Sequence, residues 1–138
     1  MVAPILVWMR EDLRWTDHPA LWRAHRSCQR HGGELIVVID PISTAGAVPL
    51  HAQRIAFETT QRHRVRRVLE QVGIRVIEAR HDGQTVVSVA HALRPRGIVS
   101  LQQWGDHTSF ARERGVRRAL RAAGIPVQDM AHGGIQRG

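Results

Sequence analysis

Short apolar runs alternate along this chain with longer segments in which apolar residues recur every three or four positions. The short runs are rich in β-branched residues and predict five strands, at residues 4–9, 34–40, 74–79, 98–102 and 125–128. The longer segments predict four helices. Strands that alternate with helices form parallel β/α units, so we expect an α/β fold in which helices cover both faces of a doubly wound, five-stranded parallel sheet.

Three of the predicted helices carry the same apolar stripe. Apolar residues at i, i+3, i+4 and i+7 place one face of a helix against the sheet. The stripes are Val65, Val68, Leu69 and Val72; Val86, Val89, Ala90 and Leu93; and Val116, Ala119, Leu120 and Ala123. Each stripe is followed by Gly-Ile, at residues 73–74, 97–98 and 124–125, where glycine is expected to end the helix in the left-handed conformation.

Single residues predict where some elements end. Asp17, which lies close to a proline, predicts the N-cap of the first helix, and Thr108 or Ser109 predicts that of the last. Pro126 predicts that the fifth strand is an edge strand, because proline has no backbone N–H to donate to a neighbouring strand.

Length and composition predict a small single domain. A chain of 138 residues with 43% hydrophobic content buries one core, so we expect a domain over residues 1–130 and a flexible tail over 131–138. No apolar run is long enough to cross a bilayer, so we expect a cytoplasmic protein with no membrane partner. The only cysteine, Cys28, has no partner for an internal disulfide and is expected to be a packed thiol.

All 20 basic residues are arginine, and the formal net charge is +8. Such a charge favours polyanions, but specific nucleic-acid binding also needs groups that stack on or read the bases. The nine histidines show no metal-ligand spacing, and neither a Gly-x-Gly-x-x-Gly motif nor a P-loop lysine is present. Trp8, Trp15 and Trp22 recur every seven residues but fall on a strand, a loop and a helix, so we expect them to pack in the core.

Polar residues follow each predicted strand. Ligands of an open parallel sheet bind outside the carboxyl ends of its strands, near the point where the strand order reverses. There Arg10 is the best donor to an anion or carbonyl, Asp40 the best acceptor and Trp104 the evident stacking platform. Each also has a purely structural interpretation: a charge network of Arg10 with Asp12 and Arg14, an ordinary strand exit at Asp40, and a loop anchor at Trp104.

Residues 8–21 are the most distinctive part of the chain. They read Trp-x-Arg-x-Asp-Leu-Arg and then Asp-His-Pro-Ala-Leu, which resembles the opening of the N-terminal α/β domain of the photolyase/cryptochrome family. The Asp-Pro at residues 40–41 and the Arg-Glu at 112–113 resemble later family positions, whereas residues 102–107 lack the family's usual Asn and Pro. The resemblance runs from about residue 4 to 127 and implies a Rossmann-like sheet of strand order 3-2-1-4-5.

In that family this domain holds a light-harvesting antenna, and a helical domain binds FAD and carries the deoxyribodipyrimidine photolyase activity. The resemblance implies that Met9, Arg10, Asp40, Arg54 and Trp104 surround an antenna chromophore. The arginines would bind its anionic or carbonyl groups, Asp40 its polar ring edge and Met9 its ring face. We expect a deazaflavin or flavin rather than a folate, which the family grips between domains, and we do not expect catalytic FAD to bind this chain.

The leading hypothesis is therefore a domain that binds an antenna chromophore or a nucleotide-like ligand and is not itself catalytic. Its expected partner is a separate FAD-binding helical domain or a second copy of the chain, and DNA is expected only as an indirect partner. Three alternatives remain open: a truncated family relative that binds no ligand, a small nucleotide-binding stress or signalling protein, and a basic nucleic-acid adaptor.

Overall fold

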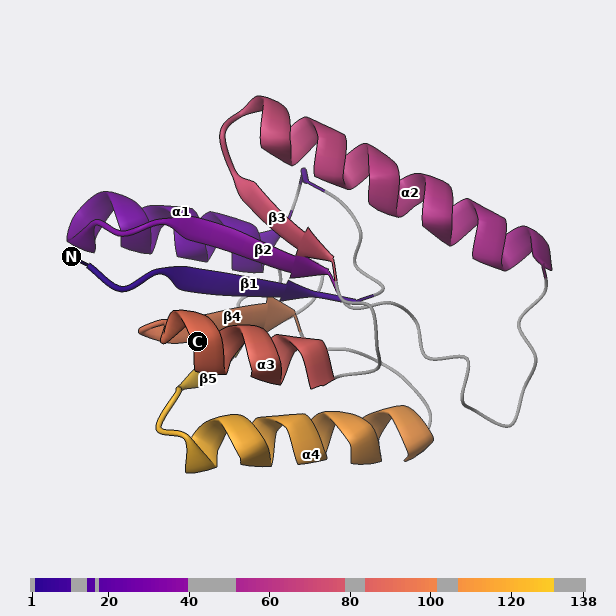
Figure 1. The fold of residues 1–138 in the computed structure, drawn as a ribbon. Helices are drawn as coiled ribbons and strands as arrows, with labels where there is room; N and C mark the ends of the chain where they lie inside the picture. Colours follow the sequence, from indigo (N-terminus) through magenta and orange to yellow (C-terminus); the bar gives the residue numbers. More distant parts are fainter. Residues whose placement is uncertain are drawn as a thin grey trace.

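The computed structural model describes residues 2–10, 15–16, 18–39, 52–78, 84–101 and 107–130. The predicted tail at 131–138 lies outside these residues. The described part contains five strands and four helices in strict alternation (Figure 1). The strands are β1 Ile5–Met9, β2 Leu35–Ile39, β3 Arg75–Glu78, β4 Gly97–Leu101 and β5 Val127–Met130. The helices are α1 Pro19–His31, α2 Ala52–Gln71, α3 Gln84–Leu93 and α4 His107–Ala122.

All neighbouring strands are parallel, and their order is β3-β2-β1-β4-β5, as predicted. The central strand β1 pairs with β2 on one side and with β4 on the other, so that Val7 lies opposite both Val37 and Val99. β5 is an edge strand, which confirms the prediction from Pro126.

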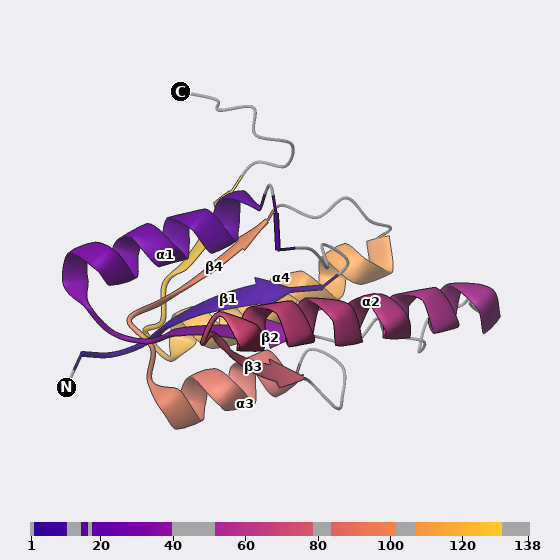
Figure 2. The same cartoon turned by 90° about the horizontal axis from the view of Figure 1, so that it is seen from above.

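Helices cover both faces of the sheet (Figures 1 and 2). Residues of α1 and α2 pack on one face with Val7 and Met9, and residues of α3 and α4 pack on the other with Leu6 and Trp8. All five residues of β1 are buried because successive side chains point to opposite faces and both faces are covered. This double burial explains why the strand is apolar throughout instead of alternating with polar residues.

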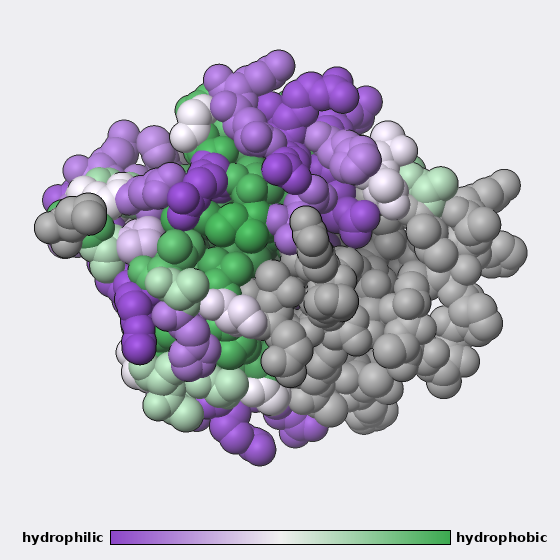
Figure 3. Space-filling model, in the orientation of Figure 1, coloured by the Kyte–Doolittle hydropathy of each residue, from purple (hydrophilic) through white to green (hydrophobic). Residues whose placement is uncertain are grey.

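Apolar side chains also approach the surface beside the edge strand β3. Figure 3 shows an apolar band that runs from the region of β3 to that of α3 and is flanked by hydrophilic surface over α2. Ile77 of β3 and Val87 of α3 are partly buried against the core of this face. The sheet is thus less fully covered at this edge than at its centre.

Two of the three Gly-Ile junctions match the prediction. Gly73 and Gly124 have φ angles of +86° and +76°, which end α2 and α4 in a conformation that suits glycine. The prediction was wrong at Gly97, which opens β4 instead. α3 ends at Leu93, and Arg94 takes the positive φ of +49° because the proline that follows prevents the helix from continuing.

Several predicted helix ends and faces were also wrong. The N-cap of α1 is His18, whose Nδ1 accepts a hydrogen bond from the backbone N–H of Leu21, and not Asp17. α4 begins at His107, which places Thr108 and Ser109 inside the helix rather than at its cap. Val72 follows the end of α2 and is 68% exposed, so it is not part of the buried stripe.

The three regularly spaced tryptophans have different environments. Trp8 is buried, and Trp15 packs half-buried against the core beneath α1. Trp22 is 61% exposed, so the prediction of core packing was wrong for this residue. The cause is its position on α1, whose buried face is formed by Ala20 and Ala24.

Candidate functional site

The carboxyl ends of all five strands meet at one edge of the sheet, and the strand order reverses at β1 (Figure 1). From β1 the chain continues to β2 and β3 on one side of the sheet and then to β4 and β5 on the other. In open parallel sheets, ligands bind in the crevice at such a reversal, because the loops that follow the two central strands diverge there. Met9 ends β1, and Arg10 follows it directly. The structure thus places Met9 and Arg10 at this edge of the sheet, and ligand binding there stays a prediction.

The structure describes the side chains of two of the five predicted site residues. Asp40 and Trp104 lie outside the described residues, as does the side chain of Arg54, whose backbone belongs to the first turn of α2. The proposed contacts of these three residues with a ligand stay predictions. Asp12 and Arg14, the predicted network partners of Arg10, also lie outside the described residues.

Met9 and Arg10 do not converge on one point. Met9 is fully buried in the core formed with α1 and α2. The guanidinium of Arg10 contacts Trp8 and Glu113 of α4, on the opposite face of the sheet. Adjacent residues of an extended segment point in opposite directions, so the two side chains are separated by the backbone of β1 itself.

Arg10 is held by groups of the protein. It is only 6% exposed, its Nε lies 2.8 Å from Oε1 of Glu113, and its Nη2 donates a 2.7 Å hydrogen bond to the carbonyl oxygen of Leu101. Its guanidinium carbon lies 3.9 Å from the centre of the Trp8 ring, within cation–π distance. Arg10 thus joins the ends of β1 and β4 to α4 through its contacts with Leu101 and Glu113. The predicted charge network of Arg10 with Asp12 and Arg14 stays a prediction, because those two residues lie outside the described ranges.

The network extends from Glu113 to β5. Arg117 lies one turn further along α4, with its Nη2 4.0 Å from Oε2 of Glu113. The two Nη atoms of Arg117 donate hydrogen bonds of 3.0 and 2.8 Å to the carboxylate of Asp129, which also accepts a 2.6 Å bond from the Ser100 hydroxyl. We call these five residues the Arg10–Asp129 network: Arg10, Glu113, Arg117, Asp129 and Ser100.

The charges of the Arg10–Asp129 network alternate in sign, and the guanidinium of Arg117 lies 5.8 Å from the same Trp8 ring on which Arg10 rests. A buried charge is stable only when it is paired and hydrogen-bonded, and this arrangement pairs each one. The network therefore fixes the carboxyl ends of β1, β4 and β5 relative to α4.

The sequence analysis missed the role of Glu113 and placed Asp129 after the fifth strand, whereas Asp129 lies within β5. In the sequence, Glu113 stood out only as part of the Arg-Glu at residues 112–113 that resembles a family position, and no local pattern links it to Arg10. Its pairing depends on how α4 packs against β1, which is a tertiary property.

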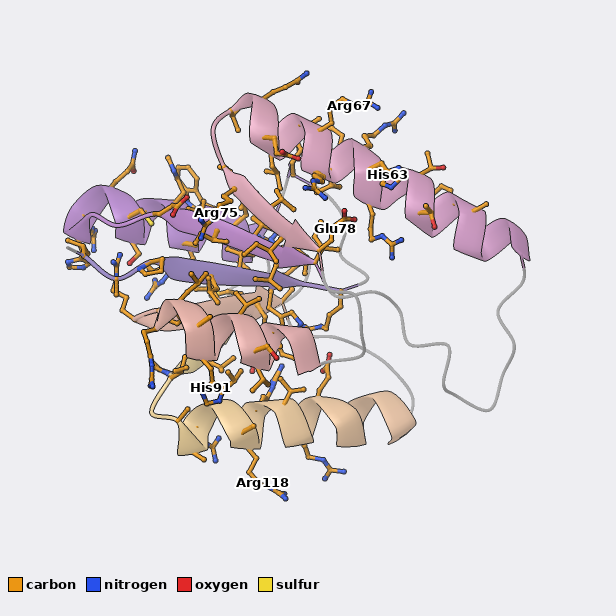
Figure 4. All side chains as sticks on the ribbon, viewed as in Figure 1. His63, Arg67, Arg75, Glu78, His91 and Arg118 are labelled. Carbon is orange, nitrogen blue, oxygen red and sulfur yellow. The ribbon has the colours of Figure 1, made fainter. Side chains whose placement is uncertain are left out.

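A second charged site lies between α2 and β3, away from the point where the strand order reverses. Figure 4 shows His63 and Arg67 on α2 and Glu78 on β3. These three residues line a hollow of about 520 Å³. Arg66 bridges Glu70 and Glu78 there, and its hydrogen bonds to these two carboxylates raise the pKa of its guanidinium. The charge on Arg66 is therefore satisfied within the protein, and neither Met9 nor Arg10, the two predicted site residues whose side chains are described, lines this hollow.

Cys28 packs half-buried against the core beneath α1, which confirms the prediction of a packed thiol. Burial raises the pKa of this thiol, although the nearby Arg96 acts in the opposite direction. Within the described ranges, no group of three or more His, Cys, Asp or Glu residues is placed to hold a metal ion. None of the helices that the structure describes is both long and apolar enough to span a membrane.

Comparison with known proteins gives matches along nearly the whole chain. The sequence model of the family described as DNA photolyase matches residues 5–133. The deoxyribodipyrimidine photo-lyase of Agrobacterium fabrum is 27% identical over 135 residues, which cover 94% of this chain and 26% of that protein. The chain thus spans about a quarter of the length of this relative.

Solved structures agree on the fold. A bacterial class III photolyase from Agrobacterium tumefaciens superposes with a TM-score of 0.74 at 24% identity, over 95% of this chain and 26% of that one. A universal stress protein from Archaeoglobus fulgidus superposes with a TM-score of 0.54 at 15% identity, over 94% and 93% of the two chains. The sheet and its strand order are therefore those of the photolyase N-terminal α/β domain.

Proposed function

This chain belongs to the DNA photolyase family, and from that premise we propose that it is an antenna domain, which holds a light-harvesting chromophore at the carboxyl ends of β1, β2 and β4. The excitation energy would pass to FAD in a helical domain that lies outside these 138 residues. In this proposal the chain performs no bond-making chemistry itself. It supplies a fixed position and orientation for the chromophore, and any repair of DNA is carried out by the partner domain.

The observation that carries the proposal is the Arg10–Asp129 network at the reversal of the strand order. Energy transfer depends on the distance and orientation between two chromophores, so an antenna site needs a rigid support. Binding sites built on strands and helices locked by their neighbours hold geometry better than sites carried by loops alone. Here the buried ion pair of Arg10 with Glu113 and the bidentate pair of Arg117 with Asp129 lock three strand ends to one helix.

The contacts of Arg10 also refine its proposed role. Because its guanidinium is already bound by Glu113, Leu101 and Trp8, we assign Arg10 to the support beneath the chromophore. The direct contacts are then proposed for Asp40, Arg54 and Trp104: a carboxylate for a ring N–H, a guanidinium for an anionic or carbonyl group, and an indole for stacking. A flavin or deazaflavin offers all three features in one planar molecule.

Titration of the purified chain tests this proposal. A deazaflavin, FMN and a reduced folate are added separately, and binding is followed by fluorescence anisotropy of the chromophore. We expect saturable one-to-one binding of the deazaflavin or flavin. Trp104→Ala should weaken it at least about fivefold, since a stacked ring contributes roughly 1–3 kcal/mol. Trp22→Ala, which removes an exposed indole on α1, is the matched control and should leave the affinity unchanged.

Two further measurements complete the test. The helical FAD domain of a photolyase, supplied as a separate chain, should form a complex with the loaded protein and quench the emission of the antenna. ATP and AMP are titrated by calorimetry in parallel. If ATP or AMP binds and none of the three chromophores does, the antenna proposal is refuted and the nucleotide-binding alternative is favoured.

A further inference from the structure

The outer face of α1 is a basic surface. The helix carries Arg23, Arg26, Arg30, His25 and His31 and has no acidic residue along its length. All five of these side chains are exposed. Among the residues that the structure describes, no carboxylate forms an ion pair with any of the three arginines. The arginines of α2 and α4 that bind Glu70, Glu78, Glu113 or Asp129 differ in this respect. No carboxylate of the described residues competes with an external anion for the three guanidiniums of α1.

These arginines line a groove of about 410 Å³ between α1 and the end of β5, which lie side by side in Figure 2. The groove is also lined by Trp22, Ser27 and Met130, and none of its described lining residues is a carboxylate. Its volume is within the range of sites that hold a small molecule or one unit of a polymer. Its chemistry is cationic on the side of α1 and apolar at Met130.

Trp22 gives the groove an aromatic surface. Its indole is 61% exposed and lies 6.1 Å, between ring centres, from the imidazole of His25. An exposed tryptophan on a surface that binds no partner is unfavourable in free energy, because a large apolar ring stays in contact with water. Guanidiniums beside an exposed aromatic ring are the combination with which proteins bind single-stranded nucleic acids, whose phosphates are anionic and whose unpaired bases can stack.

We propose that the groove along α1 binds single-stranded nucleic acid, with Arg23, Arg26 and Arg30 on successive phosphates and a base stacked on Trp22. At about 1.5 Å per residue, the first and last of these arginines are about 10 Å apart along the helix. Three flexible side chains over that length reach two or three phosphates. This direct contact goes beyond the indirect role of DNA that the family resemblance implies, and it does not depend on chromophore binding.

Other polyanions fit the groove less well. The bases of a duplex are stacked on one another and leave Trp22 without a partner. An acidic peptide satisfies the arginines but has no flat ring to place on the indole, and a phospholipid surface would meet the groove through its head groups alone. The stacking contribution of Trp22 is therefore the feature that distinguishes a single strand from these ligands.

The first experiment measures the anisotropy of a fluorescent 15-nucleotide oligothymidine titrated with the intact chain. Neutralisation of three phosphates predicts that the logarithm of affinity falls with the logarithm of salt concentration with a slope of about −2. Arg26→Glu/Arg30→Glu should weaken binding at least about tenfold. Arg118→Glu/Arg121→Glu is the matched control, because it makes the same charge change on exposed arginines of α4, where Figure 4 shows Arg118 pointing into solvent. It should weaken binding less than about threefold.

The second experiment separates stacking from charge. Trp22→Ala leaves the net charge unchanged and should weaken oligothymidine binding by about fivefold to a hundredfold, as expected for the loss of one base–aromatic stack. Binding of inorganic polyphosphate, which has no bases, should not change. Trp22, Arg26 and Arg30 are all exposed, and circular dichroism verifies that the variants fold.

Three results would overturn the proposal. Equal losses in the α1 and α4 double variants would show that only the net charge matters. An unchanged affinity of Trp22→Ala for oligothymidine would show that no base stacks there. Binding of polyglutamate or of anionic lipid vesicles as tight as that of the oligonucleotide would assign the groove to an acidic protein or a membrane instead.

Discussion

The Arg10–Glu113 pair leads to the sharpest stability prediction. Glu113→Gln keeps the shape of the side chain but removes the charge that balances Arg10, whose side chain is 6% exposed beside a Glu113 that is 12% exposed. Removing one partner of a buried pair costs about 3–5 kcal/mol. We expect the lower end, about 3 kcal/mol, because Arg10 keeps its hydrogen bond to Leu101 and its contact with Trp8.

Thermal and urea unfolding measure this cost. The entropy of unfolding of a 138-residue domain is about 0.3 kcal/mol/K near its midpoint, so a loss of 3 kcal/mol lowers the Tm by about 10 °C. Glu70→Gln is the matched control, because the same change is made in the Arg66–Glu70 pair, whose side chains are 41% and 50% exposed. An exposed pair at i, i+4 contributes only about 0.3–0.5 kcal/mol, or a change of less than about 2 °C.

A third variant separates the loss of a good interaction from the exposure of an unpaired charge. Arg10→Met/Glu113→Leu removes both charges and fills the space with apolar atoms, so its stability should return to within about 1 kcal/mol of the wild type. Equal Tm values for Glu113→Gln and Glu70→Gln would refute the reasoning. So would a double variant that is as unstable as the single one, since the cost would then come from packing and not from an uncompensated charge.

Further predictions concern packing, backbone conformation and the thiol. Leu120→Ala should cost about 2–5 kcal/mol in urea unfolding because the side chain is fully buried, whereas Val72→Ala at an exposed position should cost less than about 0.5 kcal/mol. Gly73→Ala should lower the free energy of unfolding by about 1 kcal/mol, because of the positive φ at this position alone. Gly33→Ala should lower it clearly more, since a Cβ there would also lie 2.6 Å from a backbone oxygen. Equal losses of stability in the two variants would contradict this reasoning. Because burial raises the pKa of Cys28, its alkylation by iodoacetamide at pH 8 should be slower than that of glutathione and should accelerate only in more alkaline solution; a faster reaction would show an exposed thiolate.

The architecture was predictable because its signals are repeated along the chain. β1 and β2 are continuous apolar runs, and the alternation of strands with amphipathic helices predicts parallel β/α units. The strand order was predicted from the family resemblance. The ends of helices were less predictable, because a cap depends on one side chain in one conformation. His18 rather than Asp17 caps α1, and Arg94 rather than Gly97 takes the left-handed conformation after α3.

The candidate site was likewise predictable in part. Its place at the end of β1 follows from the rule for parallel sheets and stays a prediction. Successive side chains of a strand point to opposite faces of the sheet. The sequence alone therefore predicts that Met9 and Arg10 cannot both face one ligand, although both were placed in the predicted site. The ion pair of Arg10 with Glu113 was not predictable from the sequence, because it joins residues far apart in the chain through the packing of α4 on the sheet.

The alternation of side chains along β1 also limits how this chain can change in evolution. Exchanging one apolar residue for another in β1 disturbs one face of the sheet. Deleting or inserting a single residue between Ile5 and Met9 would reverse the facing of every position beyond it, sending Trp8 toward α1 and Met9 toward α4. Related chains should therefore vary in length after Arg10 but not within the strand, and a length-scanning library selected for folding would reveal the same boundary.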